Sequence, residues 1–133
     1  MKYVLDTDII SYFIKGDLQV SRKILMAEPN SLFTTSVNCS ELLFGVMTAP
    51  HNSKKLLKDA TEFLETVEVI DFDRRAAEIF ASLKADLTRK GQIIKDLDLM
   101  IAAVTLANNA ILVTNNTKHF ERIKKLKIAN WKN

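Results

Sequence analysis

The 133-residue sequence predicts an α/β protein, a three-layer α/β/α sandwich on a mainly parallel central sheet, with residues 1–133 as a single domain. Short apolar segments alternate along the chain with longer stretches of helical periodicity, which is typical of a parallel sheet covered by helices. The composition, 47% hydrophobic and 26% charged, is that of a globular protein. A chain of this length buries a core without disulfides or structural metals.

The N-terminal segment opens with a buried strand expected at residues 2–6, which is apolar through its fourth position and ends in the carboxylate of Asp6. A helix is expected from Asp8 onward, because apolar side chains then recur on one helical face. A second helix is expected to begin after Asp17, whose side chain caps it, and to stop before Pro29.

The middle of the chain repeats this order of strand and helix. A strand is expected at residues 32–35, and the helix that begins at Ser36 carries Glu41. A further helix at residues 53–65 leads into a strand at residues 67–70. Strands separated by helical stretches in this way are expected to run parallel.

The C-terminal part begins with a long helix that Asp73 is expected to cap and Gly91 to stop. The next helix is expected to open at Asp96 or Asp98 and to end at residues 108–109. The remaining expected elements are a strand at residues 111–114, a short helix near residues 118–123 and an edge strand at residues 127–129.

Membrane insertion and secretion are not expected. No apolar run approaches the roughly 20 residues that a membrane-spanning helix needs. The first ten residues place Asp6 where a secretory signal peptide has its apolar segment. The single cysteine, Cys39, cannot form an intrachain disulfide, which fits a reducing compartment. We expect a cytoplasmic protein.

The net charge is modest, +3 from 19 basic and 16 acidic residues, but its distribution is uneven. From Asn115 to the end of the chain, six basic residues stand against one acid, Glu121. Such a segment is either a solvated basic tail or a surface that attracts phosphates, because Lys and Arg neutralise nucleic-acid phosphates. The candidates for RNA contact are Lys118, Arg122, Lys124 and Lys125.

Four polar side chains lie at the ends of the expected strands or at the starts of the helices. Asp6 ends the first strand, and Glu41 lies early in the helix after the second. Asp98 lies in the first turn of its helix, and Asn116 follows the strand at residues 111–114. Because ligand sites of open parallel sheets lie beyond the carboxyl ends of the strands, all four side chains are expected at one edge.

Each acid also has a purely structural explanation. The helix dipole favours Asp98 in a first turn, with Asp96 as the capping residue. Capping by Asp6 or by Asp8 explains one of these two residues but hardly both. Glu41 is harder to explain in this way, because its neighbours are apolar and its charge must be exposed or paired.

Converging carboxylates either share protons or bind a cation. Two of them about 4 Å apart repel by roughly 4 kcal/mol at an effective dielectric constant near 20. The sequence has no HExxH, CxxC or Cys/His cluster, which argues against zinc. All-oxygen ligands suit Mg²⁺, with Mn²⁺ as a substitute. Such an ion polarises a phosphodiester and lowers the pKa of bound water, so the predicted chemistry is phosphodiester hydrolysis.

Four segments resemble, in order, the motifs of PIN-domain ribonucleases of the VapC toxin type. They are VLDTD at residues 4–8, SELLFG at 40–45, DLMIAA at 98–103 and VTNNTKHFERI at 113–123. The ending LKIANW at residues 126–131 also resembles the tail of these toxins. The resemblance covers the chain from end to end, and four motifs in the right order are far more specific than any one alone.

This resemblance implies a cytoplasmic, Mg²⁺-dependent RNA endonuclease that acts on tRNA or another structured RNA. Such proteins are typically homodimers inhibited by a cognate antitoxin, with which they form a type II toxin–antitoxin module. By position, Asp6, Glu41 and Asp98 carry over as catalytic residues and metal ligands. Thr7 and Asn116 match polar positions that support the site.

One position departs from the family pattern. His119 stands where the family commonly has a fourth acid, Asp or Glu. A neutral imidazole removes one negative charge but still forms hydrogen bonds, so the departure bears on a second metal ion rather than on the first. Asp96, two residues before Asp98, is an acid that could compensate for it.

Two other functions fit parts of the sequence. VLDTD also resembles the DxD motif of haloacid-dehalogenase-type phosphatases, in which one Asp is the nucleophile and the next an acid. Against this function, no late acidic motif follows, and the chain is short for that fold with a cap. The second alternative is a non-catalytic RNA-binding module whose acids have lost their role. Metal-dependent RNA cleavage separates the main prediction from this second alternative, and trapping of an aspartyl-phosphate would identify the phosphatase.

Overall fold

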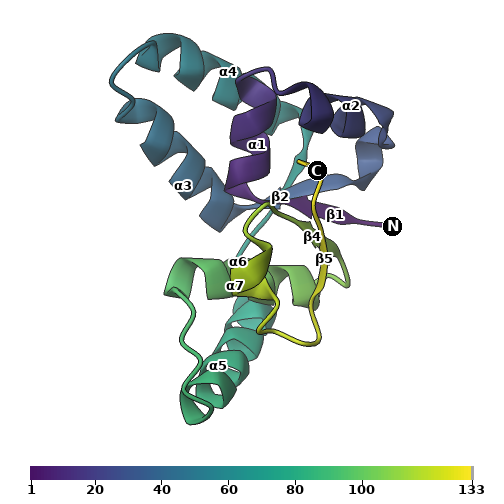
Figure 1. The fold of residues 1–133 in the computed structure, drawn as a ribbon, viewed down its shortest axis with the longest axis vertical. Helices are drawn as coiled ribbons and strands as arrows, with labels where there is room; N and C mark the ends of the chain where they lie inside the picture. Colours follow the sequence, from purple (N-terminus) through teal and green to yellow (C-terminus); the bar gives the residue numbers. More distant parts are fainter. Residues whose placement is uncertain (133) are drawn as a thin grey trace.

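The computed structural model of the protein describes residues 1–132 and shows five parallel strands in one sheet, in the order β3-β2-β1-β4-β5 (Figure 1). The strands are β1 (Tyr3–Leu5), β2 (Leu32–Thr35), β3 (Glu68–Ile70), β4 (Ile111–Val113) and β5 (Lys127–Ala129). β1 is the central strand and pairs with β2 on one side and β4 on the other. The predicted parallel sheet is confirmed, with β5 at its edge.

Helices cover both faces of this sheet and complete the predicted three-layer α/β/α sandwich (Figure 1). The first group is α1 (Thr7–Ile14), α2 (Leu18–Met26), α3 (Ser36–Met47) and α4 (Ser53–Thr66). The second group, on the other side, is α5 (Arg74–Arg89), α6 (Asp96–Ala107) and α7 (Thr117–Phe120). None of the helices formed by residues 1–132 combines the length and the apolar character needed to cross a bilayer.

Successive residues of the central strands contribute to two separate hydrophobic cores, one on each face of the sheet. Val4 and Leu112 pack with α5, α6 and α7, whereas Leu5 and Val113 pack with α1, α2 and α4. This follows from the two-residue period of a strand, which sends neighbouring side chains to opposite faces. All four side chains are fully buried, which explains why β1 and β4 are uninterrupted apolar runs.

Acidic side chains begin three of the helices. Asp17 and Asp73 each accept a backbone N–H of the first turn, at 3.0 and 2.9 Å, so both predicted caps are confirmed. α1 begins at Thr7, one residue earlier than expected, because the Asp6 carboxylate accepts the N–H of Thr7 at 2.9 Å. Of the two candidate caps for this helix, the structure therefore selects Asp6.

The start of α6 differs from the prediction. The residue before the helix is Lys95, and no side chain caps this end. Asp96 is instead exposed and forms an ion pair of 2.9 Å with Lys84 of α5. The expectation that Asp96 caps α6 was therefore wrong, because the structure offers this carboxylate a cationic partner on the neighbouring helix.

Backbone pairing continues one residue past the central strands at their carboxyl ends. The N–H of Asp6 donates to the carbonyl of Val113, and the N–H of Thr114 donates to the carbonyl of Ala129, both at 2.9 Å. Asp6 and Thr114 therefore lie side by side at the carboxyl edge of the sheet. This is the edge at which the sequence predicted a site.

Candidate active site

Asp6 is the most buried acid of the described chain, with 6% of its surface exposed. Three donors hold its carboxylate. Thr114 Oγ1 donates to Oδ2 at 2.7 Å, while Asn38 Nδ2 and the Thr7 N–H donate to Oδ1 at 3.0 and 2.9 Å. Burial nevertheless raises the pKa of Asp6, and the charge of Asp98 raises it further.

A chain of hydrogen bonds through uncharged side chains connects Asp6 to Glu41. Asn38 of α3 is fully buried, and its Nδ2 also donates to Thr7 Oγ1 at 2.9 Å. Thr7 in turn donates to Glu41 Oε1 at 2.8 Å. The amide of Asn38 is fixed by Thr35, which donates to its Oδ1 at 2.8 Å. The first turns of α1 and α3 are thereby joined, and the predicted neighbours Thr7 and Glu41 are in contact.

Glu41 is partly buried beside the other two acids. Burial raises the pKa of its carboxyl first, and the nearby charges of Asp6 and Asp98 raise it further, while the positive charge of Lys95 acts in the opposite direction. A carboxylate that responds to both other acids lies close to both. Asp6, Glu41 and Asp98 therefore form one electrostatic cluster at the edge of the sheet, although they come from three different helix starts.

Asp98 faces the imidazole of His119. Asp98 Oδ2 lies 3.6 Å from His119 Nδ1, and Asn116 Nδ2 lies 3.0 Å from the same ring nitrogen. The backbone N–H of Asn116 donates to Thr114 Oγ1 at 3.0 Å, so this side of the site is connected back to Asp6. The structure thus brings both Asn116 and His119 to the acids, as their positions in the sequence suggested.

Asp8 is an acid that the sequence analysis considered only as a cap. Its Oδ2 accepts the backbone N–H of Asn115 at 3.1 Å. Its Oδ1 is buried and has no hydrogen-bond partner among residues 1–132. Burial first, and then the charges of Asp6 and Asp98, raise the pKa of Asp8 to about 6, although the backbone N–H of Asn115 acts in the opposite direction. The site therefore contains a fourth acid, which lies in the first turn of α1, two residues after Asp6.

The acids are neighbours but are not preassembled. Among residues 1–132, no three Asp, Glu, His or Cys side chains are already placed to hold a metal ion. Carboxylates repel each other, by about 4 kcal/mol for two of them 4 Å apart at a dielectric constant of 20, and Asp6 and Glu41 are each held instead by neutral donors. Their role as metal ligands therefore stays a prediction.

The chemistry of these side chains fits a hard divalent cation. They offer carboxylate oxygens, which Mg²⁺ and Mn²⁺ prefer over softer ligands. The unpartnered Oδ1 of Asp8 is a buried oxygen that a cation or its water shell would satisfy. Burial is the main cause that raises the pKa values of Asp6, Asp8 and Glu41, and the charges of the neighbouring acids raise them further, so a positive charge would be stabilised here.

Other candidates lie outside this cluster. Asp96 points to Lys84 at the surface, because residues two positions apart in a helix face different directions, so it does not join Asp98. Lys118 is exposed on α7 beside His119. The other three basic candidates line a separate hollow; they are Arg122, Lys124 and Lys125. Sequence reasoning missed Asn38 and Thr114. Thr114 directly follows β4 and obeys the same edge rule as Asp6, whereas Asn38 lies in the first turn of α3, three residues after β2.

A family model described as PIN domain matches residues 3–126. Among curated proteins, Ribonuclease VapC2 of Rickettsia felis is 38% identical, and tRNA(fMet)-specific endonuclease VapC of Shigella flexneri is 30% identical; each alignment covers 98% of both chains. Among solved structures, VapBC2 from Rickettsia felis bound to a promoter DNA fragment superposes with a TM-score of 0.90 at 35% identity, covering 98% of this chain and 99% of that one. DNA-bound VapBC from Salmonella typhimurium superposes with a TM-score of 0.91 at 28% identity, covering 98% of each chain.

Proposed function

The chain belongs to the PIN-domain family, and from this premise we propose that it is a Mg²⁺-dependent RNA endonuclease, the toxin of a type II toxin–antitoxin module. The observation that carries the chemistry is the cluster of Asp6, Glu41 and Asp98 at the carboxyl edge of the sheet. The curated relatives are named as ribonucleases or endonucleases, and they align with this chain over nearly their full length, which supports the same reaction here. The phosphatase alternative loses its motivation, since the family match covers far more than the VLDTD motif.

We assign the cation to the carboxylates of Asp6, Glu41 and Asp98, with Mn²⁺ as a substitute for Mg²⁺. When bound, the cation supplies Lewis-acid activation of the phosphodiester and of the attacking water. The protein's own side chains fix the positions of these carboxylates. Thr114 and Asn38 orient the Asp6 carboxylate, and the hydroxyl of Thr7 orients Glu41. Residues that hold ligands in place in this way usually matter almost as much as the ligands themselves.

His119 provides a proton-holding group beside the acids. With Asn116 Nδ2 as the donor, Nδ1 of the ring is an acceptor, and the ring proton lies on Nε2. The same ring nitrogen lies 3.6 Å from Asp98 Oδ2, so the imidazole is held between Asn116 and Asp98. We therefore assign His119 to positioning and proton transfer rather than to the tight binding of a second cation.

For the substrate we propose a structured RNA such as tRNA. Two curated relatives, from Shigella flexneri and Salmonella typhimurium, are tRNA(fMet)-specific endonucleases at 30% and 29% identity. The acids lie at an edge of the sheet rather than in a deep cavity, and a hollow that includes Glu41 has a volume of only about 180 Å³. Such an open site accepts a backbone exposed in a loop of a folded RNA.

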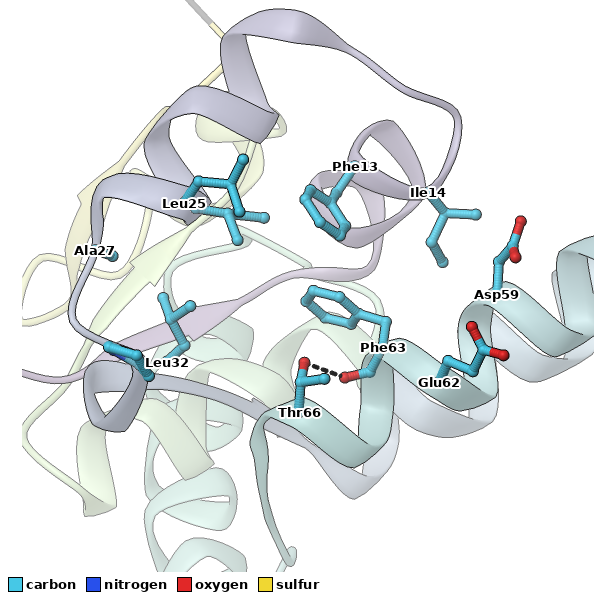
Figure 2. Close-up of a pocket in the computed structure, with 11 residues that line it drawn as sticks. Phe13, Ile14, Leu25, Ala27, Leu32, Asp59, Glu62, Phe63 and Thr66 are labelled. Carbon is cyan, nitrogen blue, oxygen red and sulfur yellow. Dashed lines mark hydrogen bonds between the residues drawn. The ribbon is translucent and has the colours of Figure 1, made fainter.

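The partner we propose is a protein antitoxin that docks in an apolar pocket between α1, α2 and α4. Solved relatives include complexes described as VapBC. The pocket has a volume of about 520 Å³. Figure 2 shows Phe13 and Phe63 facing each other inside it, with the carboxylates of Asp59 and Glu62 along the α4 side. These features fit a segment with apolar side chains flanked by Lys or Arg.

The same pocket also places the antitoxin near the acids. Ile14 lines both this pocket and the smaller hollow that contains Thr7 and Glu41. A segment that fills the pocket therefore lies next to the hollow that contains Glu41. Leu25, whose side chain is 77% exposed at the rim, is suited to a test. Leu25→Glu should prevent neutralisation by the antitoxin while the protein still cleaves RNA.

Self-association is part of the proposal. The homodimer expected from the sequence stays a prediction, and the exposed apolar side chains of Phe44 and Met47 on α3 are a surface that could support it. Sedimentation equilibrium of the wild type and of Phe44→Glu tests it. A monomeric wild type at micromolar concentration would contradict it.

The function is tested by incubating the purified protein with total RNA and with a single 5′-labelled tRNA, in Mg²⁺, Mn²⁺ or EDTA. We expect discrete internal cuts with either metal and none with EDTA. Expression alone should arrest growth, and the antitoxin gene should relieve the arrest. Absence of cleavage by folded protein in both metals would refute the nuclease, and harmless expression of an active nuclease would refute only the toxin role.

A further inference from the structure

A second hollow, away from the acids, is strongly basic. It lies between the C-terminal end of α5 and the segment that follows α7, and its volume is about 420 Å³. Five of its lining residues are cationic and one is acidic. The cations are Arg89, Lys90, Arg122, Lys124 and Lys125, and the acid is Asp86. We call this hollow the basic pocket.

Internal pairing leaves most of this charge unmatched. Lys90 pairs with Asp86 at 3.1 Å, which accounts for the only carboxylate that lines the pocket. Within the described part of the chain, neither Arg89 nor Lys124 nor Lys125 has a carboxylate within 4 Å. Cations gathered around one hollow repel each other, so an anion in the hollow would be stabilised by several of them at once.

The helix dipole explains only part of this arrangement. Arg89 and Lys90 lie at the C-terminal end of α5, where cations are favoured. The other three cations come from residues 122–125, a separate segment with no such reason to be there. Arg122 is fixed in place, because its Nη1 donates to the carbonyl of Ile93 at 2.7 Å. The two segments are thus held against each other with their cations on a shared surface.

The basic pocket lies on a path to the acids. The Ile93 carbonyl that holds Arg122 belongs to the loop before α6, and Asp98 lies in the first turn of that helix. A neighbouring hollow of about 330 Å³ shares Leu87 with the basic pocket and extends to Lys95. Lys95 is close enough to Glu41 for its charge to lower the pKa of that carboxyl. Of the two cations of this neighbouring hollow, Lys84 is paired with Asp96, so Lys95 is the one that carries positive charge from the pocket toward the site.

We propose that the basic pocket binds backbone phosphates of the RNA substrate at nucleotides away from the bond that is cut. The inference rests on the proposed function and adds the surface that holds the rest of the RNA. Lys and Arg side chains recognise phosphodiester oxygens without regard to base sequence, so the pocket contributes affinity and orientation rather than base specificity. Lys118, exposed on α7, is not part of it.

The test measures RNA binding without cleavage. Fluorescence anisotropy with a labelled tRNA in EDTA gives Kd over a range of salt concentrations for a triple variant, Arg89→Gln with Lys124→Gln and Lys125→Gln. A matched control, Lys23→Gln with Lys54→Gln and Lys58→Gln, removes three exposed cations from α2 and α4 in the other helix layer. Arg122 is left intact, because its bond to Ile93 also holds the loop.

We expect Kd of the triple variant to rise at least tenfold at 100 mM salt. The slope of log K against log salt should fall by about 2, because each lost phosphate contact contributes about 0.7–0.9. The control should stay within twofold of the wild type. Equal Kd values for the triple variant and the control, with both folded by circular dichroism, would overturn the proposal.

Two further outcomes are informative. If the triple variant loses affinity for an acidic peptide such as polyglutamate but binds tRNA as the wild type does, the pocket serves a protein and the RNA proposal is wrong. Because the binding assay contains no metal, its result is independent of catalysis. Weakened RNA binding combined with no cleavage by the wild type in Mg²⁺ would support the pocket and refute the nuclease.

Discussion

Replacing Asp8 by asparagine should make the metal-free protein more stable at neutral and alkaline pH. Asp8 carries a buried oxygen without a partner, and its pKa is about 6 instead of the ordinary 3.8, because burial and then the charge of Asp6 oppose ionisation. Its ionised form therefore destabilises the fold. Asparagine has the same shape, keeps an oxygen for the Asn115 N–H, and carries no charge.

The magnitude follows from the difference in pKa. A pKa of about 6 for Asp8 in the folded protein, against 3.8 in the unfolded chain, corresponds to about 3 kcal/mol of lost stability at pH well above 6. Asp8 is only partly buried, and solvent screening reduces this to about 1–3 kcal/mol. Since the folded pKa is raised, the wild type loses this stability as pH rises from about 4 to about 7. Below pH 4 both proteins carry a neutral side chain, and the difference should vanish.

Urea unfolding in EDTA, followed by fluorescence of the single tryptophan, Trp131, measures the effect at pH 4, 6 and 8. The exposed Glu65→Gln should show no such pH-dependent gain and serves as the control. Added Mg²⁺ should stabilise the wild type more than Asp8→Asn, because the variant has lost one charge that attracts the cation. A variant less stable than the wild type at pH 8, or a difference independent of pH, would refute the reasoning.

Three further changes test the supports of the site. Thr114→Val removes a donor to the buried Asp6 and should lower the free energy of unfolding by about 1–3 kcal/mol at pH 8. The loss should be smaller at low pH, because burial raises the pKa of Asp6 and so favours its neutral form, which accepts a hydrogen bond less strongly. Urea unfolding at pH 8 and pH 4 measures this, and an equal loss at both would contradict it. His119→Ala should slow RNA cleavage without abolishing it, whereas His119→Glu should lower the Mg²⁺ concentration needed for half-maximal cleavage. If the Mg²⁺ dependence of cleavage is the same for the wild type and both variants, His119 has only a structural role. Phe120→Ala should lower the free energy of unfolding by about 3–5 kcal/mol, because this fully buried ring anchors the helix that carries His119. A loss under 1 kcal/mol in urea unfolding would show that other contacts hold α7 in place.

The sheet was predictable because both of its faces are buried. Such strands are short continuous apolar runs, and β2 has the expected bounds, Leu32–Thr35. The short helix after Asn116 was less predictable. It ends at Phe120, yet the buried side chains of Ile123 and Leu126 continue a helical spacing. In the structure this spacing comes from successive three-residue turns, with Ile123 N–H donating to Phe120 and Leu126 N–H donating to Ile123.

The position of the site was predictable from topology, but its internal partners were not. The rule that sites follow the carboxyl ends of strands identified Asp6, Glu41 and Asp98 before any contact was known. It did not show that Asn38 connects Asp6 to Thr7, because a buried amide network depends on the relative rotation of two helices. Local sequence also favours the capping explanation of Asp96, and only the packing of α5 against α6 provides its actual partner, Lys84.

The most direct test of the central claim is calorimetric titration of Mn²⁺ and Mg²⁺ into the metal-free wild type and into Asp98→Asn at pH 7.5. If Asp6, Glu41 and Asp98 hold the cation together, the wild type binds at least one ion per chain. The variant should bind it at least tenfold more weakly while remaining folded, because one of the clustered carboxylates is lost. Equal affinity of the two proteins, or no binding by the wild type, would contradict the account.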